Sequence, residues 1–297
     1  MADPRFHGSG VALVTPFDGQ GVNERVLREL VEFQVQEGTD ALIMCGSTGE
    51  AATMCPAEQR RAIEIAVSAC NGRMPVIAGC GGSDTAQVET LAKQARSAGA
   101  DALLVSAPPY NKPPQRGLVL HYRRVMDAGD LPTIVYNVPG RTSVNILPAT
   151  IEEICTDSRV IGVKEACGDI SQIAELARRV VDRVAIWSGN DDQIVPIMAL
   201  GGTGVISVLA NVAPRDTSRI AHAFLDGDVK TARSLQLRYL PLIATLFAEP
   251  NPIPVKNAVR WLGFQVGELR PPLVDSDPAA WKKVEQALRE VGLRPLK

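Results

Sequence analysis

The sequence has few of the residues that mark metal centres and disulfide scaffolds. Its 297 residues include six cysteines and three histidines, and no C-x-x-C, H-E-x-x-H or zinc-ligand spacing occurs among them. Six thiols in a chain of this length are too few for a disulfide scaffold, and we expect the reduced, buried cysteines of a cytoplasmic protein. No motif in the sequence predicts a bound metal ion.

The sequence also lacks an excess of charge of either sign. Lysine and arginine number 31, and aspartate and glutamate number 33, for a formal net charge of −2. Without a broad cationic surface, we do not expect binding to nucleic acid or to a membrane. The first residues lack the basic and then apolar run of a signal peptide. One uncharged stretch, 194–214, has membrane length, but proline, glycine and polar residues interrupt it, and we interpret it as buried core.

What the sequence does contain is a regular series of short, β-branched apolar runs. Amphipathic helical patterns fill most of the gaps between them, which is the alternation typical of β/α units. Strands that are apolar on both faces form parallel sheets covered by helices, and eight such units favour a (β/α)8 barrel, or TIM barrel. The runs lie at residues 11–14, 41–44, 75–78, 102–105, 133–136, 160–163, 184–187 and 204–208.

The alternative to a barrel is an open, doubly wound sheet. The G-x-G-x-x-G turn of such sheets does not follow the first run, and the nearest stretch, 79–84, lacks the final glycine. After the eighth run the pattern is helical from about residue 215 to residue 291. We therefore predict a barrel over residues 1–214 and a C-terminal helical extension over 215–297, which either covers the barrel or serves a subunit interface.

Functional side chains of such barrels gather where strands end and βα loops begin. Lys164 ends the sixth run and alternates in step with Val160 and Gly162, so we expect it inside the barrel. Loss of water lowers the pKa of an ammonium group there, and a neutral amine can attack a carbonyl carbon to form a Schiff base. The alternative is a lysine that turns outward or pairs with Glu165.

Neighbouring strand ends carry groups that suit such a lysine. Tyr136 ends the fifth run and should also face inward, where a phenol can relay protons. Arg141, in the following Pro-Gly turn, offers a planar fork to a carboxylate. Ser47 and Thr48 stand between two glycines after the second run, where hydroxyl and backbone N–H groups can hold a small carboxylate.

Two further features need a separate interpretation. Tyr110 follows the fourth run in a proline-rich loop, which would push its side chain away from the rim and toward a subunit contact. Asp191 and Asp192 could form a catalytic carboxylate pair. Adjacent residues that open a helix are better interpreted as caps of its N-terminus, and this is our expectation for both.

Taken together, these segments resemble those of the dihydrodipicolinate synthase and N-acetylneuraminate lyase superfamily of Schiff-base aldolases, in the same order and spacing. Segment 136–142 is similar to the dihydrodipicolinate synthase branch in particular, because of its arginine. The matching segments are 46–50, 109–111, 136–142, 162–166, 188–192, 204–208 and 251–256.

The resemblance implies a condensation on the lysine pathway, also called diaminopimelate biosynthesis. Lys164 would condense with pyruvate, and the resulting enamine would attack L-aspartate 4-semialdehyde to give 4-hydroxy-tetrahydrodipicolinate. Tyr136 would be the central proton relay, flanked by Ser47 and by Tyr110 from a neighbouring subunit of a dimer or tetramer.

The resemblance also implies how the substrates are held. The hydroxyl and backbone groups of Ser47 and Thr48 would bind the pyruvate carboxylate, and Arg141 would bind the carboxylate of the semialdehyde. Gly189 and Ile206 would line the pocket through their main chain. Because the protonated imine is itself the electron sink, we expect no metal and no organic cofactor.

Regulation is expected to differ from that of lysine-inhibited members of the superfamily. Their allosteric pocket contains histidine, asparagine, glutamate and tyrosine side chains. The matching positions here are Gln59, Ser83, Gln87 and Pro109, which offer no carboxylate to an ammonium group and no aromatic wall. We expect feedback inhibition by lysine to be weak or absent.

Two alternatives remain at the level of sequence. The same Lys164 and Tyr136 would serve a pyruvate-dependent sugar-acid or sialic-acid lyase, or a related dehydratase. A barrel that binds a keto acid without turnover is the non-enzymatic alternative. Arg141 favours the synthase over the lyases.

Overall fold

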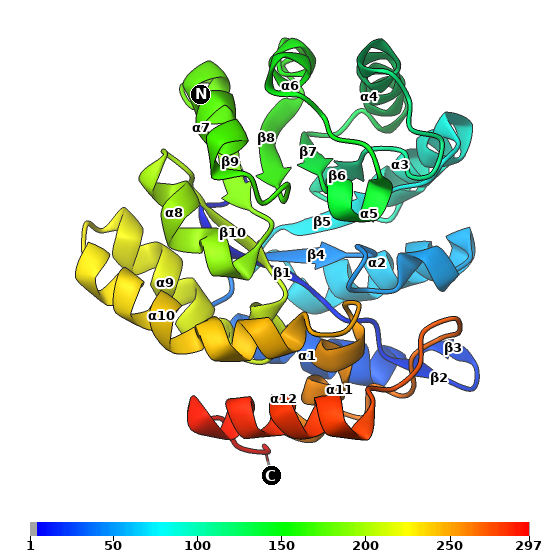
Figure 1. Ribbon diagram of the computed structural model, residues 1–297. Helices are drawn as coiled ribbons and strands as arrows, with labels where there is room; N and C mark the ends of the chain where they lie inside the picture. The colour runs from blue at the N-terminus through cyan, green and yellow to red at the C-terminus, as the bar shows by residue number, and fades with distance from the viewer. Residues whose placement is uncertain (1–4, 297) are drawn as a thin grey trace.

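Eight parallel strands close into a barrel in the computed structural model, which describes residues 5–296 (Figure 1). Each barrel strand pairs with the next along the chain, and the last pairs with β1 to complete the ring. The predicted (β/α)8 barrel is confirmed. The strands are β1 (Gly8–Ala12), β4 (Ala41–Met44), β5 (Val76–Cys80), β6 (Ala102–Ser106), β7 (Thr133–Asn137), β8 (Val160–Glu165), β9 (Ala185–Ser188) and β10 (Gly204–Ser207).

The first strand begins at Gly8 rather than at residue 11, where its apolar run starts. A side chain at Gly10 would place its Cβ 2.8 Å from Ile43 and 3.0 Å from the ring of Phe6. The barrel interior has room only for glycine at this position. The strand therefore starts in a segment that shows no apolar pattern.

A ring of helices surrounds the strands in Figure 1. The first of them begins at an Asn23 cap, whose side chain accepts the Val26 N–H at 3.2 Å, and buries the apolar stripe that its periodicity predicts. The helices of the ring are α1 (Glu24–Gln36), α2 (Pro56–Cys70), α3 (Thr85–Ser97), α4 (Gln115–Gly129), α6 (Pro148–Ile154), α7 (Ile170–Val180), α8 (Ile194–Ala199) and α9 (Pro214–Leu225).

Short elements connect these units. They are the hairpin β2 (Phe17–Asp18) and β3 (Gly21–Val22), the single turn α5 (Pro139–Thr142), and the 3-10 turns η1 (Ala51–Thr53), η2 (Asp191–Gln193) and η3 (Leu209–Asn211). The uncharged stretch 194–214 folds into α8, β10 and η3, and all four residues of β10 are buried. No helix among residues 5–296 is both long enough and apolar enough to cross a membrane.

The N-terminal end of the barrel is filled by aromatic packing. Phe6, which precedes β1, stacks on Trp187 of β9 with ring centroids 4.7 Å apart. A Cβ at Gly162 of β8 would lie 2.2 Å from the Trp187 ring, so the indole occupies the space that a larger residue would need. The barrel interior beside Gly162 is therefore filled by side chains.

Three C-terminal helices follow the ring: α10 (Val229–Leu246), α11 (Ile253–Leu262) and α12 (Pro278–Glu290). Figure 1 shows them, in yellow to red, on the side of the barrel occupied by α9 and α1. The preceding helix, α9, packs beside β1 as a member of the ring. The division into residues 1–214 and 215–297 stays a prediction.

Candidate active site

Lys164 and Tyr136 meet inside the C-terminal end of the barrel. The two residues are paired across β7 and β8, and Tyr136 packs against the apolar side chains that fill the interior. The Lys164 Nζ lies 4.3 Å from the centroid of the Tyr136 ring, and only 5% of the lysine is exposed. The alternation of side chains along the strands therefore predicts the placement of both residues correctly.

The electrostatic surroundings of Lys164 favour a neutral amine. Burial lowers the pKa of Lys164 to about 7, because the ammonium form loses its hydration, and the Arg141 charge acts in the same direction. The carboxylate of Asp191 opposes both effects. Near neutral pH a large share of the lysine is therefore present as the nucleophilic free amine.

Glu165 does not pair with Lys164. It faces outward and accepts hydrogen bonds from Asn137 Nδ2 at 3.0 and 3.2 Å and from the Cys167 N–H at 2.8 Å. On the same two strands, the inward pair is thus lysine and tyrosine, whereas the outward pair is glutamate and asparagine. The alternative interpretation of Lys164 as an outward, ion-paired lysine is wrong.

Tyr136 has the protonation state that a proton relay needs. Burial raises the pKa of its phenol to about 12, although the Arg141 charge opposes this effect. The phenol is therefore protonated at neutral pH and able to donate. Its ring lies beside the Lys164 amine, with the Nζ 4.3 Å from the ring centroid.

The loop after β4 forms a tight turn at the mouth of the barrel. Gly49 and Glu50 donate backbone hydrogen bonds of 3.1 Å to the Gly46 and Ser47 carbonyls, respectively. Ser47 is exposed at the rim. Thr48 is buried, and its hydroxyl oxygen accepts the Asn251 Nδ2–H at 2.9 Å.

Arg141 and Tyr110 lie on loops at the same end of the barrel. Arg141, on α5, is exposed at the surface and donates from Nη2 to the Asn251 carbonyl oxygen at 2.9 Å. Tyr110, on the loop after β6, has a backbone φ of +70° and is 87% exposed. The structure thus brings Arg141 to Asn251 and leaves Tyr110 projecting from the surface of this chain.

Gly189 lies against Lys164, and Ile206 lies in the barrel interior. The Gly189 N–H donates to the Glu165 carbonyl at 2.7 Å, and a Cβ at Gly189 would lie 3.1 Å from the Lys164 Cε. Ile206, on β10, is fully buried among the side chains of the barrel interior. Any side chain at position 189 would crowd Lys164.

The expectation that Asp191 and Asp192 cap the helix they open is wrong. No side chain caps η2 or α8. Asp191 is buried, and its Oδ2 accepts the backbone N–H groups of Val208 and Leu209 at 3.0 and 2.9 Å. It therefore ties the loop after β9 to the loop after β10, a contact between separate β/α units that local helix signals do not predict.

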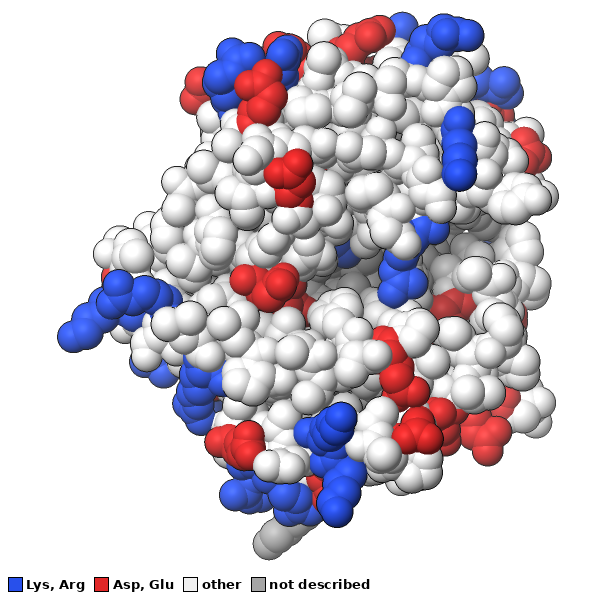
Figure 2. Space-filling model, in the orientation of Figure 1, with Lys and Arg blue, Asp and Glu red and all other residues white. Residues whose placement is uncertain are grey.

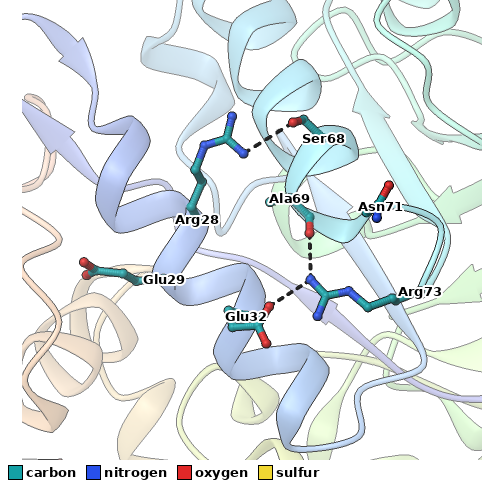
Figure 3. Close-up of a pocket in the computed structure, with 7 residues that line it drawn as sticks. All are labelled: Arg28, Glu29, Glu32, Ser68, Ala69, Asn71 and Arg73. Carbon is teal, nitrogen blue, oxygen red and sulfur yellow. Dashed lines mark hydrogen bonds and ion pairs between the residues drawn. The ribbon is translucent and has the colours of Figure 1, made fainter.

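The surface shows two depressions of different character. Figure 2 shows a hollow near the centre of the face, with basic side chains exposed in it. Figure 3 shows a groove between α1 and α2, where Arg73 pairs with Glu32 at 2.8 Å and Arg28 lies 3.3 Å from the Ser68 hydroxyl. The other two charged residues of this groove pair outside it, Arg28 with Glu24 and Glu29 with Arg25, so the groove offers no unpaired charge to a ligand.

Sequence reasoning missed the contribution of the C-terminal segment to the site. Segment 251–256 was matched only through its resemblance, with no role for its residues. Asn251 contacts Thr48 across 203 residues of sequence, and Lys256 contacts Glu50 across 206. An asparagine between two prolines and a lysine in an apolar segment suggest a fixed local structure, but neither indicates which distant residue it contacts.

Among the described residues, no group of three or more His, Cys, Asp or Glu side chains could hold a metal ion.

Comparison with known proteins finds strong similarity along almost the whole chain. The model of the dihydrodipicolinate synthetase family matches residues 5–291. A 4-hydroxy-tetrahydrodipicolinate synthase of Thermoanaerobacter sp. (strain X514) is 51% identical over 291 residues, covering 98% of each chain. Among solved structures, dihydrodipicolinate synthase from Aquifex aeolicus aligns with a TM-score of 0.95 at 41% identity, covering 98% of this chain and 100% of that one.

A second solved structure is the dihydrodipicolinate synthase of Acinetobacter baumannii, described as chloride inhibited and complexed with pyruvate. It aligns with a TM-score of 0.94 at 36% identity, covering 97% of this chain and 99% of that one.

Proposed function

The chain belongs to the dihydrodipicolinate synthetase family, and from that premise we propose that it is a 4-hydroxy-tetrahydrodipicolinate synthase that condenses pyruvate with L-aspartate 4-semialdehyde. The observation that carries this proposal is a buried lysine that forms no ion pair with a carboxylate within residues 5–296, its Nζ 4.3 Å from the Tyr136 ring centroid. Burial holds the pKa of this lysine at about 7. Such an amine is free to add to a ketone at neutral pH.

The reaction begins when the neutral Lys164 amine attacks the carbonyl carbon of pyruvate. Tyr136 relays the protons that allow water to leave, giving a protonated imine. Loss of a proton from the methyl carbon converts the imine into an enamine, and that carbon attacks the aldehyde of the semialdehyde. The amine of the semialdehyde then adds to the imine carbon, closes the ring and releases Lys164. The protonated imine is the electron sink, so this scheme uses no added cofactor.

The loops around Lys164 hold the two acids. Thr48, with its hydroxyl oxygen already occupied by Asn251, directs its O–H toward the pyruvate carboxylate, and Ser47 contributes at the exposed rim. Arg141 has N–H groups left for the carboxylate of the semialdehyde. The main chain of Gly189 and Ile206 forms the wall behind the imine.

Oligomerisation is part of this proposal. A tyrosine that is 87% exposed on a loop held at positive φ is placed to reach another molecule rather than its own barrel. We assign Tyr110 to the proton relay of a neighbouring subunit in a cytoplasmic dimer or tetramer.

The experiment is reductive trapping followed by product analysis. Borohydride and pyruvate together should add mass to Lys164, and the untreated enzyme should convert pyruvate and aspartate semialdehyde into the cyclic product. Turnover of N-acetylmannosamine in place of the semialdehyde would identify a sialic-acid lyase. An adduct without turnover of either aldehyde would identify a keto-acid-binding protein, and the absence of an adduct would reject Schiff-base chemistry.

Lysine should be a poor inhibitor. Gln59 directs its Nε2 to the carbonyls of Ala51 and Met54, and neither Gln87 nor Pro109 supplies a charge for a lysine ammonium. Activity should stay within about twofold of its uninhibited value at millimolar lysine, since an ammonium group without a carboxylate partner gains little on binding. Strong inhibition below the millimolar range would contradict this prediction.

A further inference from the structure

The segment between α10 and α11 returns to the mouth of the barrel and contacts both carboxylate-binding loops. Asn251, 6% exposed, donates from Nδ2 to the Thr48 hydroxyl oxygen at 2.9 Å. Its main-chain carbonyl accepts the Arg141 Nη2–H, also at 2.9 Å. One residue of the C-terminal extension therefore touches a group assigned to each of the two substrates.

The bond to Thr48 determines how its hydroxyl can act. A hydroxyl carries one hydrogen, and an oxygen that accepts from an amide N–H keeps that hydrogen free to donate. An anionic ligand needs a donor, so Asn251 leaves Thr48 in the state that binds a carboxylate. If the amide donor were lost, the hydroxyl would be free to rotate and to donate to other acceptors.

The bond to Arg141 limits the freedom of a long side chain. A guanidinium has five N–H donors, and the Asn251 carbonyl occupies one of them. The remaining donors keep the fork geometry that matches a carboxylate, at a lower loss of side-chain entropy on binding. The same residue thus orients donors toward two adjacent anionic ligands.

The position of Asn251 is fixed by an anchor that does not involve its side chain. Lys256 and Glu50 are fully buried and lie 2.6 Å apart, and the Lys256 Nζ also donates to the Glu268 carbonyl at 2.9 Å. The other Glu50 oxygen accepts the Arg270 N–H at 2.9 Å. Because this anchor joins the segment to the Ser47–Thr48 turn, changing the Asn251 side chain should leave the segment in place.

The amide is not kept for stability alone. Its Oδ1 is buried and has no hydrogen-bond partner among the described residues. Buried polar atoms without partners destabilise a fold, so an apolar residue of similar size would suit a purely structural position better. What such an apolar residue could not supply is the Nδ2–H that donates to the Thr48 hydroxyl oxygen.

We propose, resting on the function proposed above, that Asn251 is a positioning residue shared by the two substrate subsites. Its side chain orients Thr48 for the keto-acid carboxylate, and its main chain orients Arg141 for the second carboxylate. The C-terminal extension is then part of the active site rather than only a cover or an interface.

The test separates side chain from main chain. In Asn251→Ala the Nδ2 donor is lost and the carbonyl stays, so the apparent KM for pyruvate should rise roughly 5- to 10-fold while the KM for the semialdehyde changes less than about twofold. Asn251→Asp, which keeps the shape but turns the donor into an anion, should raise the KM for pyruvate further. Asn257→Ala on α11, beside Asp275 and Ser276, is the matched control and should change neither constant.

A double-mutant cycle with Thr48→Val measures the coupling between the Asn251 side chain and the Thr48 hydroxyl. Asn251→Ala should have little further effect on the pyruvate KM once the Thr48 hydroxyl is gone. Borohydride trapping at saturating pyruvate should remain complete in Asn251→Ala, which shows that Lys164 is intact. Unchanged KM values in both Asn251 variants, or additive effects with Thr48→Val, would overturn the inference. A wild-type enzyme that forms no adduct would instead overturn the proposed function.

Discussion

Lys164 and Lys256 are both buried, and each holds its Nζ over an aromatic ring, at 4.3 Å from the centroid of Tyr136 and 4.4 Å from that of Phe17. Lys256 also has the Glu50 carboxylate at 2.6 Å, whereas no hydrogen bond or ion pair links Lys164 Nζ to any part of the described chain. Burial lowers the pKa of both lysines, but Glu50 opposes this effect at Lys256. One buried lysine is thus paired with a carboxylate, and the other is the one that we propose as the nucleophile.

The difference shows that burial alone does not define a reactive lysine. An ammonium group taken out of water must either find a counter-charge or lose its proton. The Lys256 pair joins the C-terminal extension to the turn after β4. In the part of the chain that the structure describes, Lys164 has no such partner, and burial favours its neutral amine.

Lys164→Met should have the largest effect, because it should remove nearly all synthase activity while leaving the stability of the fold almost unchanged. Removal of the amine should lower kcat/KM by about a thousandfold or more and abolish borohydride trapping. The free energy of unfolding in urea should not fall by more than about 1 kcal/mol, because methionine fills the same space without a charge. Retention of synthase activity would show that another group forms the imine.

Glu50→Gln should produce the opposite result, a loss of stability. Removal of one partner of a buried ion pair leaves the other charge uncompensated, and the free energy of unfolding should fall by about 3–5 kcal/mol. Glu29→Gln is the matched control, since Arg25 Nη1 and Glu29 are also 2.6 Å apart but 68% and 45% exposed. That variant should change stability by less than about 1 kcal/mol in the same urea titration. Equal effects of the two variants would contradict the assignment of Lys256 as a buried cation.

Arg141→Ala tests a smaller contribution to the state of Lys164. The Arg141 charge lowers the pKa of this lysine less than burial does. The apparent KM for aspartate semialdehyde should rise roughly 10- to 100-fold, and that for pyruvate much less, if the guanidinium binds the second carboxylate as proposed. Removal of its charge should also raise the pKa of Lys164, so that trapping with pyruvate begins at higher pH than in the wild type. A shift to lower pH would contradict this account of the site.

The sequence was sufficient to predict the barrel and the groups at its strand ends. Two-residue alternation assigns Lys164 and Tyr136 to the interior because β7 and β8 are regular where they carry these residues. The same reasoning failed at β1, which begins in Gly8-Ser9-Gly10, where the interior needs small residues rather than apolar ones. Helix-capping rules also assigned Asp191 to the helix it opens, whereas its carboxylate accepts backbone N–H groups of the loop after β10.

Contacts between distant segments could not be predicted from local patterns. The hydrogen bond from Asn251 to Thr48 and the pair of Lys256 with Glu50 each join positions more than 200 residues apart, at 203 and 206. They depend on how α11 packs against the barrel, which neither periodicity nor capping signals specify. The roles of the candidate residues stay predictions until they are measured.

The most direct measurement is the pH dependence of imine formation at Lys164, followed by cyanoborohydride trapping with pyruvate and mass spectrometry. Only the neutral amine adds to the ketone, so the trapping rate should fall as pH decreases through a midpoint of about 7, the pKa that burial gives this lysine. A rate that continues to rise tenfold per pH unit beyond about pH 9, as for a lysine in water, would contradict the account.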